Sequence, residues 1–137
     1  MSTRATYLIT EHAFHPAVCF YIHSDGYPEY AFHYFQNAVA ADDKSCNSSF
    51  AERFIRANDT AEFTSGHDAH GDTEYRYTYT PQVNEPMRGR DLKAAGTLKV
   101  ENSVYHEGKP ETWETVFEAP LAAFIAKYDV PALAIVR

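Results

Sequence analysis

The sequence predicts one α+β domain over residues 1–137, with an antiparallel sheet of about five to six strands that carries helices on one face. Three observations lead to this prediction. The chain has 137 residues, which is the size of a single domain. Hydrophobic residues make up 45% of it, which is enough apolar surface to form a core. Strand and helix patterns follow the order ββ, αα, ββββ, α, without the alternation that a parallel α/β sheet requires.

The amino-terminal part is expected to form a hairpin followed by two helices. β-branched and aromatic residues over 5–10 and 17–23 predict two strands, and the short connector between them favours antiparallel pairing. Pro28 and the apolar stripe that follows it predict a helix over 28–41. A capping-box pattern predicts a second helix over 50–57. We expect the two helices to pack as an antiparallel pair on one face of the sheet.

In the second half of the chain, apolar residues recur at every second position, which is typical of strands. We predict strands over 61–64, 74–80, 97–105 and 112–118, a short carboxy-terminal helix over 120–128, and an added edge strand in 131–137. Residues 81–96 contain prolines, glycines and mixed charge, and they predict a long loop.

Charge and composition exclude some functions. Twelve Lys and Arg oppose nineteen Asp and Glu, giving a net charge of −7. Nucleic-acid binding depends on neutralising phosphates, so we expect no direct nucleic-acid partner. No apolar run reaches the length of a membrane span, and the polar start lacks the core of a signal peptide. Two lone cysteines, Cys19 and Cys46, are typical of a reducing cytoplasm, where we expect the protein.

The segment 65–72, Ser-Gly-His-Asp-Ala-His-Gly-Asp, is the densest polar cluster of the chain. Its imidazole and carboxylate groups are ligands that divalent metals accept, so His67, His70 and Asp72 are candidate metal ligands. The alternative is a solvated turn between two strands.

Two further candidates lie near the first predicted helix and in the middle of the chain. His23 at a strand end could act as a general base oriented by Asp25, or the helix start could hold an anion; alternatively, Asp25 caps the helix. Arg56 and Arg76 could form an anion pocket together with His67. The alternative pairs Arg56 with the acidic residues that follow it in sequence.

Tyr75, Tyr77 and Tyr79 alternate with polar residues and share one strand face. Such a row could stack a base or a ligand, contribute aromatic anchors to a protein interface, or close a core. The segments 98–104 and 113–117 add further apolar residues, so we expect a sheet face that one helical layer leaves uncovered. A twofold dimer through that face, with Tyr77 or Tyr79 near its centre, or through an edge strand at 133–136, would cover it.

Three blocks of the sequence resemble a group of small uncharacterised proteins that occur in bacteria, prophages and plasmids. They are Met-Ser-Thr-Arg-Ala-Thr-Tyr over 1–7, Tyr-Ile-His-Ser-Asp-Gly-Tyr-Pro-Glu over 21–29, and Arg-Ala-Asn over 56–58 followed by 67–79. The resemblance implies a cytoplasmic protein of phage or mobile-element origin. Small acidic proteins of that origin often bind and block host machinery, including defence nucleases.

We therefore expect a non-enzymatic acidic binding protein of inhibitor type that docks on a host or phage protein and needs no cofactor. Its expected binding residues are Tyr75, Tyr77, Tyr79, Arg56, Arg76 and Asp25. The alternative is a small metal- or His-dependent hydrolase of a phosphate-containing small molecule or nucleotide, with His23, His67 and His70 as catalytic residues and a divalent metal as cofactor. A third hypothesis is a ligand sensor that binds an anion after His23.

Overall fold

A computed structural model describes residues 3–10, 17–41, 50–80, 96–105, 107–108 and 111–129. Along them lie β1 (Ala5–Ile9), β2 (Val18–Ile22), α1 (Pro28–Ala40), α2 (Phe50–Ala57), β3 (Glu62–Thr64), a 3-10 turn η1 (His67–Ala69), β4 (Tyr75–Thr80), β5 (Thr97–Val104), β6 (Thr112–Pro120) and α4 (Leu121–Tyr128). The α+β class is confirmed. The loop predicted at 81–96 lies almost wholly outside the described residues, as do Cys46 and the edge strand predicted in 131–137.

The six strands form one mixed sheet in the order β3-β2-β1-β4-β5-β6. The predicted hairpin is present, since β1 and β2 pair antiparallel with Tyr7 opposite Phe20. The central pair differs from the prediction of an antiparallel sheet, because β1 and β4 run parallel with Tyr7 beside Tyr77. Parallel neighbours need a crossover connection, and residues 65–74 supply it after β3.

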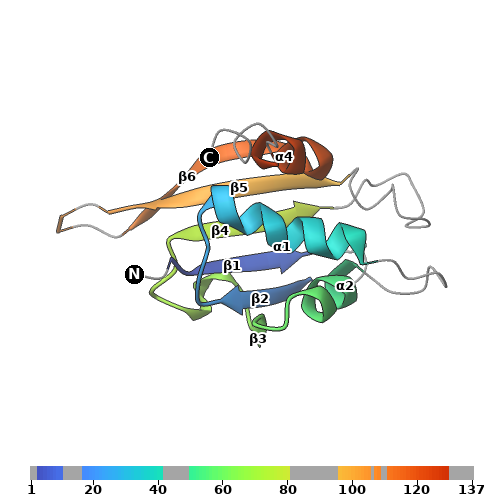
Figure 1. The fold of residues 1–137 in the computed structure, drawn as a ribbon. Coiled ribbons are helices and arrows are strands. Elements are labelled where there is room, and N and C mark those ends of the chain that lie inside the picture. Colours follow the sequence, from blue (N-terminus) through green and yellow to red (C-terminus); the bar gives the residue numbers. More distant parts are fainter. Residues whose placement is uncertain are drawn as a thin grey trace, which may run out of the picture.

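The three helices of the described residues cover the same face of the sheet, and α1 and α2 pack against each other as predicted (Figure 1). Alternate residues of the strands point toward the helices, which is why the apolar positions of each strand fall on one face. None of the described helices combines the length and the apolar character that a membrane crossing requires.

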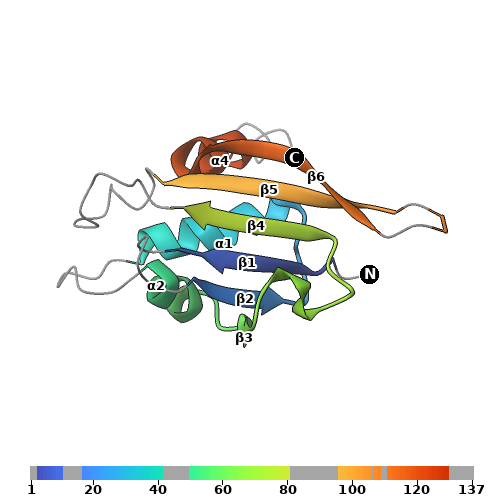
Figure 2. The ribbon, with the colours of Figure 1, turned by 180° about the vertical axis from the view of Figure 1, so that it is seen from behind.

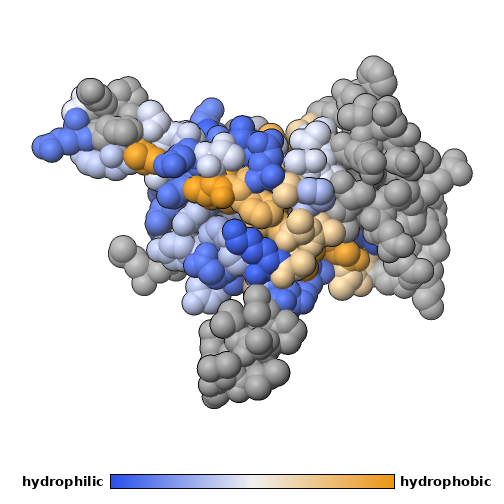
Figure 3. All heavy atoms as spheres, turned by 90° about the horizontal axis from the view of Figure 1, so that it is seen from above, coloured by the Kyte–Doolittle hydropathy of each residue, from blue (hydrophilic) through white to orange (hydrophobic). Residues whose placement is uncertain are grey.

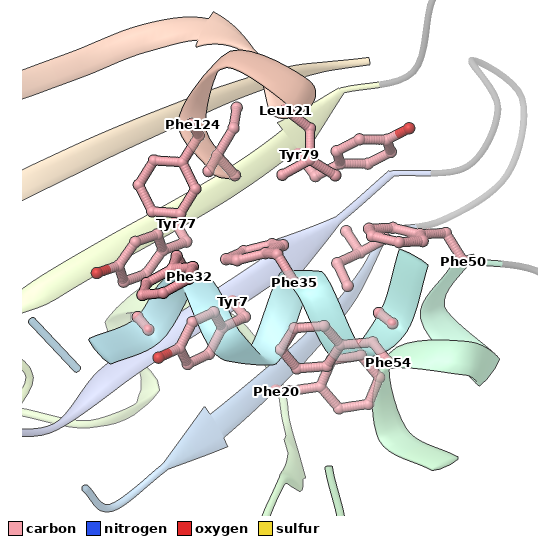
Figure 4. Packing of buried hydrophobic residues seen from close by; sticks show 14 of the residues in the cluster. Tyr7, Phe20, Phe32, Phe35, Phe50, Phe54, Tyr77, Tyr79, Leu121 and Phe124 are labelled. Atoms are coloured by element: carbon pink, nitrogen blue, oxygen red, sulfur yellow. The ribbon is translucent and has the colours of Figure 1, made fainter. Parts of the chain in front are cut away.

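The core between the sheet and the helices is rich in aromatic rings (Figure 4). Tyr7 stacks on Tyr77 with ring centroids 4.8 Å apart, and Phe35 of α1 lies 5.7 Å from both rings. Phe124 brings α4 into the same cluster, at 5.9 Å from Phe35. This packing buries Tyr77 and Tyr79 of the β4 row instead of leaving them on a surface.

The opposite face of the sheet is more polar, and the crossover connection passes over β2 and β1 toward one end of these strands (Figure 2). Thr6 is fully buried there although it points away from the helices, because η1 and the residues around it cover this face. Farther out, β5 presents Lys99 and Glu101 on the same side. Leu98 and Val100 of β5 are fully buried on the helical side, and Phe117 of β6 meets Phe124 of α4, so the prediction that one helical layer leaves these residues uncovered is wrong. Trp113 of β6 lies on the opposite face, against the Arg76 guanidinium.

The start of α1 depends on a tight approach between two chain segments. The Gly26 N–H donates to the Thr3 carbonyl at 3.0 Å, and a Cβ at Gly26 would lie 2.9 Å from that oxygen. The helix cap is Tyr27, in extended conformation, and not Asp25 as one prediction had it. The proline that follows Tyr27 restricts it to that conformation. Asp25 is instead exposed, with a positive φ of 58°.

Candidate functional site

His67 is held on the polar sheet face by two threonines. Its Nδ1 lies 2.7 Å from the Thr6 hydroxyl and its Nε2 lies 2.9 Å from the Thr78 hydroxyl. Burial and the nearby Arg76 guanidinium lower the pKa of His67 to about 4. The ring is therefore neutral at pH 7, with one nitrogen donating and the other accepting a hydrogen bond. Because both ring nitrogens are hydrogen-bonded to threonines, His67 has a structural role.

His70 and Asp72 flank Tyr21 on the neighbouring strand. The His70 ring stacks on the Tyr21 ring at 3.7 Å with an interplanar angle of 8°, and its Nε2 lies 3.0 Å from the Thr64 hydroxyl. The Tyr21 hydroxyl donates to the Asp72 carboxylate at 2.9 Å. Arg4 also contacts Asp72, with Nε 3.2 Å from Oδ2. These contacts fasten the crossover connection to β1 and β2.

The structure does not bring the three predicted metal ligands together. His67 bonds to Thr6 and Thr78, whereas His70 contacts the ring of Tyr21 and Asp72 accepts the hydrogen bond of its hydroxyl. Across the described ranges, no group of three His, Cys, Asp or Glu side chains has an arrangement that could hold a metal ion. Close spacing in sequence does not create a shared site here, because His67 is held by threonines of β1 and β4, whereas His70 and Asp72 turn toward Tyr21 of β2.

His23 lies at the end of β2, but its neighbour is not the predicted Asp25. The His23 Nε2 lies 2.8 Å from a carboxylate oxygen of Glu62, and both side chains are more than half exposed. The Tyr21 ring meets the His23 ring edge-on at 4.6 Å. A carboxylate orients this imidazole after all, but from the edge strand β3 and in open solvent.

The predicted anion pocket of Arg56, Arg76 and His67 is not formed. Arg76 lies on the polar sheet face, ion-paired with Asp68 and with its guanidinium carbon 3.9 Å above the Trp113 ring. Arg56 belongs to α2, on the helical side of the sheet. There it pairs with Glu52 one turn earlier, at 3.6 Å. The sheet therefore separates the two arginines.

The tyrosine row of β4 divides between core and surface. Tyr77 and Tyr79 are fully buried, so the prediction that they contribute to a binding surface or to the centre of a dimer interface is wrong. Both side chains point toward the helices, and they are covered because their strand lies in the middle of the sheet, beneath α1 and α4 (Figure 4). Tyr75, at the start of the strand, is half-buried and remains partly accessible.

A partly exposed group of tyrosines and carboxylates surrounds the amino end of α1. Tyr27 and Tyr30 expose 41% and 57% of their surface, and the Tyr27 ring meets the Tyr75 ring at 5.6 Å and 65°. We call this group the acidic tyrosine surface. It comprises Tyr27, Tyr30 and Tyr75 with the exposed acidic residues Asp25, Glu29 and Glu74.

The carboxylates of this surface act on its tyrosine rings. Burial is the first cause that raises the pKa of Tyr75, and the charge of Glu29 is the second. Glu29 also contributes to the raised pKa of Tyr77, after burial and neighbouring tyrosines. Glu29 is itself exposed, yet its charge acts on Tyr75 at the neighbouring strand.

A second exposed feature is apolar. Seen from above, a band of hydrophobic residues crosses the described surface between hydrophilic areas (Figure 3). Among the exposed apolar residues are Ala122, Ala123 and Ala126 of α4, and Val116 of β6, which exposes 47% of its surface. A register shift between β5 and β6 leaves Val116 without a cross-strand partner in that pair.

Sequence reasoning missed the tyrosines that are accessible. Tyr27 and Tyr30 lie three residues apart, beside the apolar stripe of α1, and this spacing was the available signal. The sequence carries no signal for the stacking of Arg76 on Trp113, because this contact depends on the pairing of β4, β5 and β6.

Comparison of the chain with protein families, with curated proteins and with solved structures gave no match.

Proposed function

We propose that this chain is a non-enzymatic binding protein that docks on a basic protein partner through its acidic tyrosine surface. The observation that carries the proposal is the joint exposure of aromatic rings and carboxylates around the start of α1. Tyrosine is enriched at protein interfaces because one side chain offers a large, rigid area together with a polar hydroxyl.

Electrostatics supports a basic partner. The chain carries a net charge of −7, and Asp25, Glu29 and Glu74 add a local negative potential beside the exposed rings. Complementary charge mainly speeds association and sets specificity, and salt screens it. Docking of this kind should therefore weaken as ionic strength rises.

The alternative, a metal- or His-dependent hydrolase, receives less support. His67 is neutral and hydrogen-bonded at both nitrogens, and His70 is stacked on Tyr21. A general base must reach a substrate proton with a free nitrogen and a pKa near the working pH. A pKa of about 4 leaves His67 a weak base at pH 7.

Three further parts of the proposal rest on the sequence. The three sequence blocks that resemble prophage and plasmid proteins support a phage or mobile-element origin, a cytoplasmic location and a role as an inhibitor of host machinery. We propose no cofactor and no nucleic-acid partner. A homodimer stays a prediction, and light scattering across a hundredfold dilution tests it against a constant mass near 15.5 kDa.

The experiment is capture of partner proteins from host-cell lysate at low salt and at about 0.5 M salt. The bait is the wild-type chain, a Tyr27→Ser/Tyr30→Ser variant, or a Tyr105→Ser control. Tyr105 exposes 80% of its surface at the end of β5, outside the acidic tyrosine surface, so it controls for loss of an exposed tyrosine in general.

We expect a partner that the wild type and the control retain at low salt, and that the double variant and high salt release. Capture that is equal for the double variant and the wild type would contradict docking through this surface. A lysate without any salt-sensitive partner would contradict the proposed function itself.

A further inference from the structure

We infer that the corner formed by the rings of Tyr27 and Tyr75, beside the carboxylate of Glu29, binds an alkylated ammonium group such as that of a methylated lysine. The inference rests on the proposed function, since it names the group on the partner that this surface takes.

The two rings have the geometry of an aromatic corner. Their centroids are 5.6 Å apart and their planes are inclined at 65°, in an edge-to-face contact, and we take the two rings as the walls of the corner. Tyr27 is 41% exposed and Tyr75 is half-buried, so both side chains remain partly accessible to solvent. A cation placed over an aromatic face is attracted by the negative charge of the ring, and methyl groups on the cation add apolar contact with both walls.

The corner is fixed before any ligand arrives. Tyr27 is the cap residue of α1, and its carbonyl accepts the N–H groups of Tyr30 and Ala31 at 2.9 and 2.7 Å. The preceding Gly26 is held from two sides. Its N–H donates to Thr3, and its carbonyl accepts the Tyr77 hydroxyl at 2.6 Å. A ligand therefore does not have to order this loop, which lowers the entropic cost of binding.

Glu29 supplies the charge that a cation requires. Its carboxylate is exposed, and its charge reaches the Tyr75 ring, as the raised pKa of Tyr75 indicates after burial is taken into account. Glu74, the neighbour of Tyr75 in sequence, adds a second negative charge that acts on this ring. These carboxylates would repel an anionic ligand.

The same chain already places cations on aromatic rings elsewhere. The Arg76 guanidinium lies 3.9 Å above Trp113, and the Lys127 ammonium lies 5.3 Å from the Phe117 ring and 5.4 Å from the Tyr128 ring. Within the described part of the chain, none of these contacts uses Tyr27 or Tyr75. The corner thus offers the same chemistry to a cation from outside.

The experiment uses three small probes of similar shape and the full chain. Choline carries a trimethylammonium group, 3,3-dimethylbutanol replaces its nitrogen by carbon, and ethanolamine keeps the charge without the methyl groups. Proton NMR at low salt follows the methyl signals of choline and of 3,3-dimethylbutanol, which ring currents shift upfield over an aromatic face. Ethanolamine has no methyl signal, so its binding is measured by how far it displaces choline.

We expect a saturable upfield shift for choline and weaker binding of both other probes. Tyr27→Leu should weaken choline binding roughly two- to fivefold, the equivalent of one exposed cation–π contact. Tyr27→Phe, which keeps the ring, should retain it. Glu29→Gln should weaken it without changing the fold, and Tyr105→Leu is the matched control.

Equal binding of choline and 3,3-dimethylbutanol, or an unshifted choline signal throughout the titration, would overturn the inference. An equal loss in Tyr27→Leu and Tyr105→Leu would overturn it as well. Circular dichroism of each variant separates lost binding from lost folding. The outcome is distinct from that of partner capture, because choline binding needs no partner and capture needs no alkylated ammonium.

Discussion

Replacing His67 with glutamine should flatten the acid dependence of stability. In the folded protein, burial and Arg76 lower the pKa of His67 from its ordinary 6.5 to about 4. Between these values the unfolded chain binds a proton that the folded chain excludes, so the free energy of unfolding falls as the pH falls. The stability tied to a neutral His67 is complete above pH 6.5 and is lost as the pH approaches 4.

The size of the effect follows from the shift. A change from 6.5 to about 4 corresponds to about 3 kcal/mol. His67 is only partly buried, so screening by solvent reduces this to roughly 2 kcal/mol. At pH 7 the glutamine variant should be less stable than the wild type by about 1–2 kcal/mol, because its contacts with Thr6 and Thr78 are less well matched. That gap should narrow by the same roughly 2 kcal/mol on acidification.

The assay is urea denaturation of wild type and His67→Gln, followed by the fluorescence of Trp113, at steps from about pH 7.5 to about pH 4.5. Subtracting the two curves removes the other titrating groups, which both chains share. A gap that stays constant over this range would refute the reasoning. So would an NMR titration in which the His67 ring protonates near pH 6.5.

Three other substitutions or reactions test the packing. Gly26→Ala should cost about 1–3 kcal/mol, since its Cβ would lie 2.9 Å from a backbone oxygen, whereas Gly66→Ala, with open space around it, should be neutral in the same thermal melt. Tyr77→Phe should cost about 1–2 kcal/mol in urea denaturation because it leaves the buried Gly26 carbonyl without its donor, and an equal cost for Tyr105→Phe would argue against this account. Burial raises the pKa of the Cys19 thiol to about 11. In a Cys46→Ser variant, Cys19 should therefore react with a disulfide reagent only when the protein unfolds, and fast labelling of the native chain would contradict its burial.

Much of the fold could be predicted because local signals agree with it. Pro28 indicates where α1 begins, and the alternation of Tyr75, Tyr77 and Tyr79 indicates a strand. What the alternation could not decide was which face is covered. Burial of Tyr77 depends on Phe124, which lies far along the chain and arrives with α4.

The candidate site was less predictable for the same reason. His67, His70 and Asp72 are close in sequence, but their partners Thr6, Thr78 and Tyr21 come from three different strands. Neither spacing nor composition encodes the parallel pairing that brings β1 beside β4. From the sequence alone, residues that bind a metal and residues that hold a loop against the sheet therefore cannot be told apart.

The central position of β1 also shapes the order in which the protein can fold during synthesis. β1 is complete at Ile9, but its parallel partner in β4, Tyr79, is translated seventy residues later. At about 5–20 residues per second, this leaves roughly 4–14 s in which β1 has β2 on one side and an unpaired edge on the other. An open edge of β-branched and aromatic residues is a template for pairing with another chain. Nascent chains on neighbouring ribosomes should therefore associate first through β1, and a chaperone that shields it should raise the yield of folded protein more than one that acts after release.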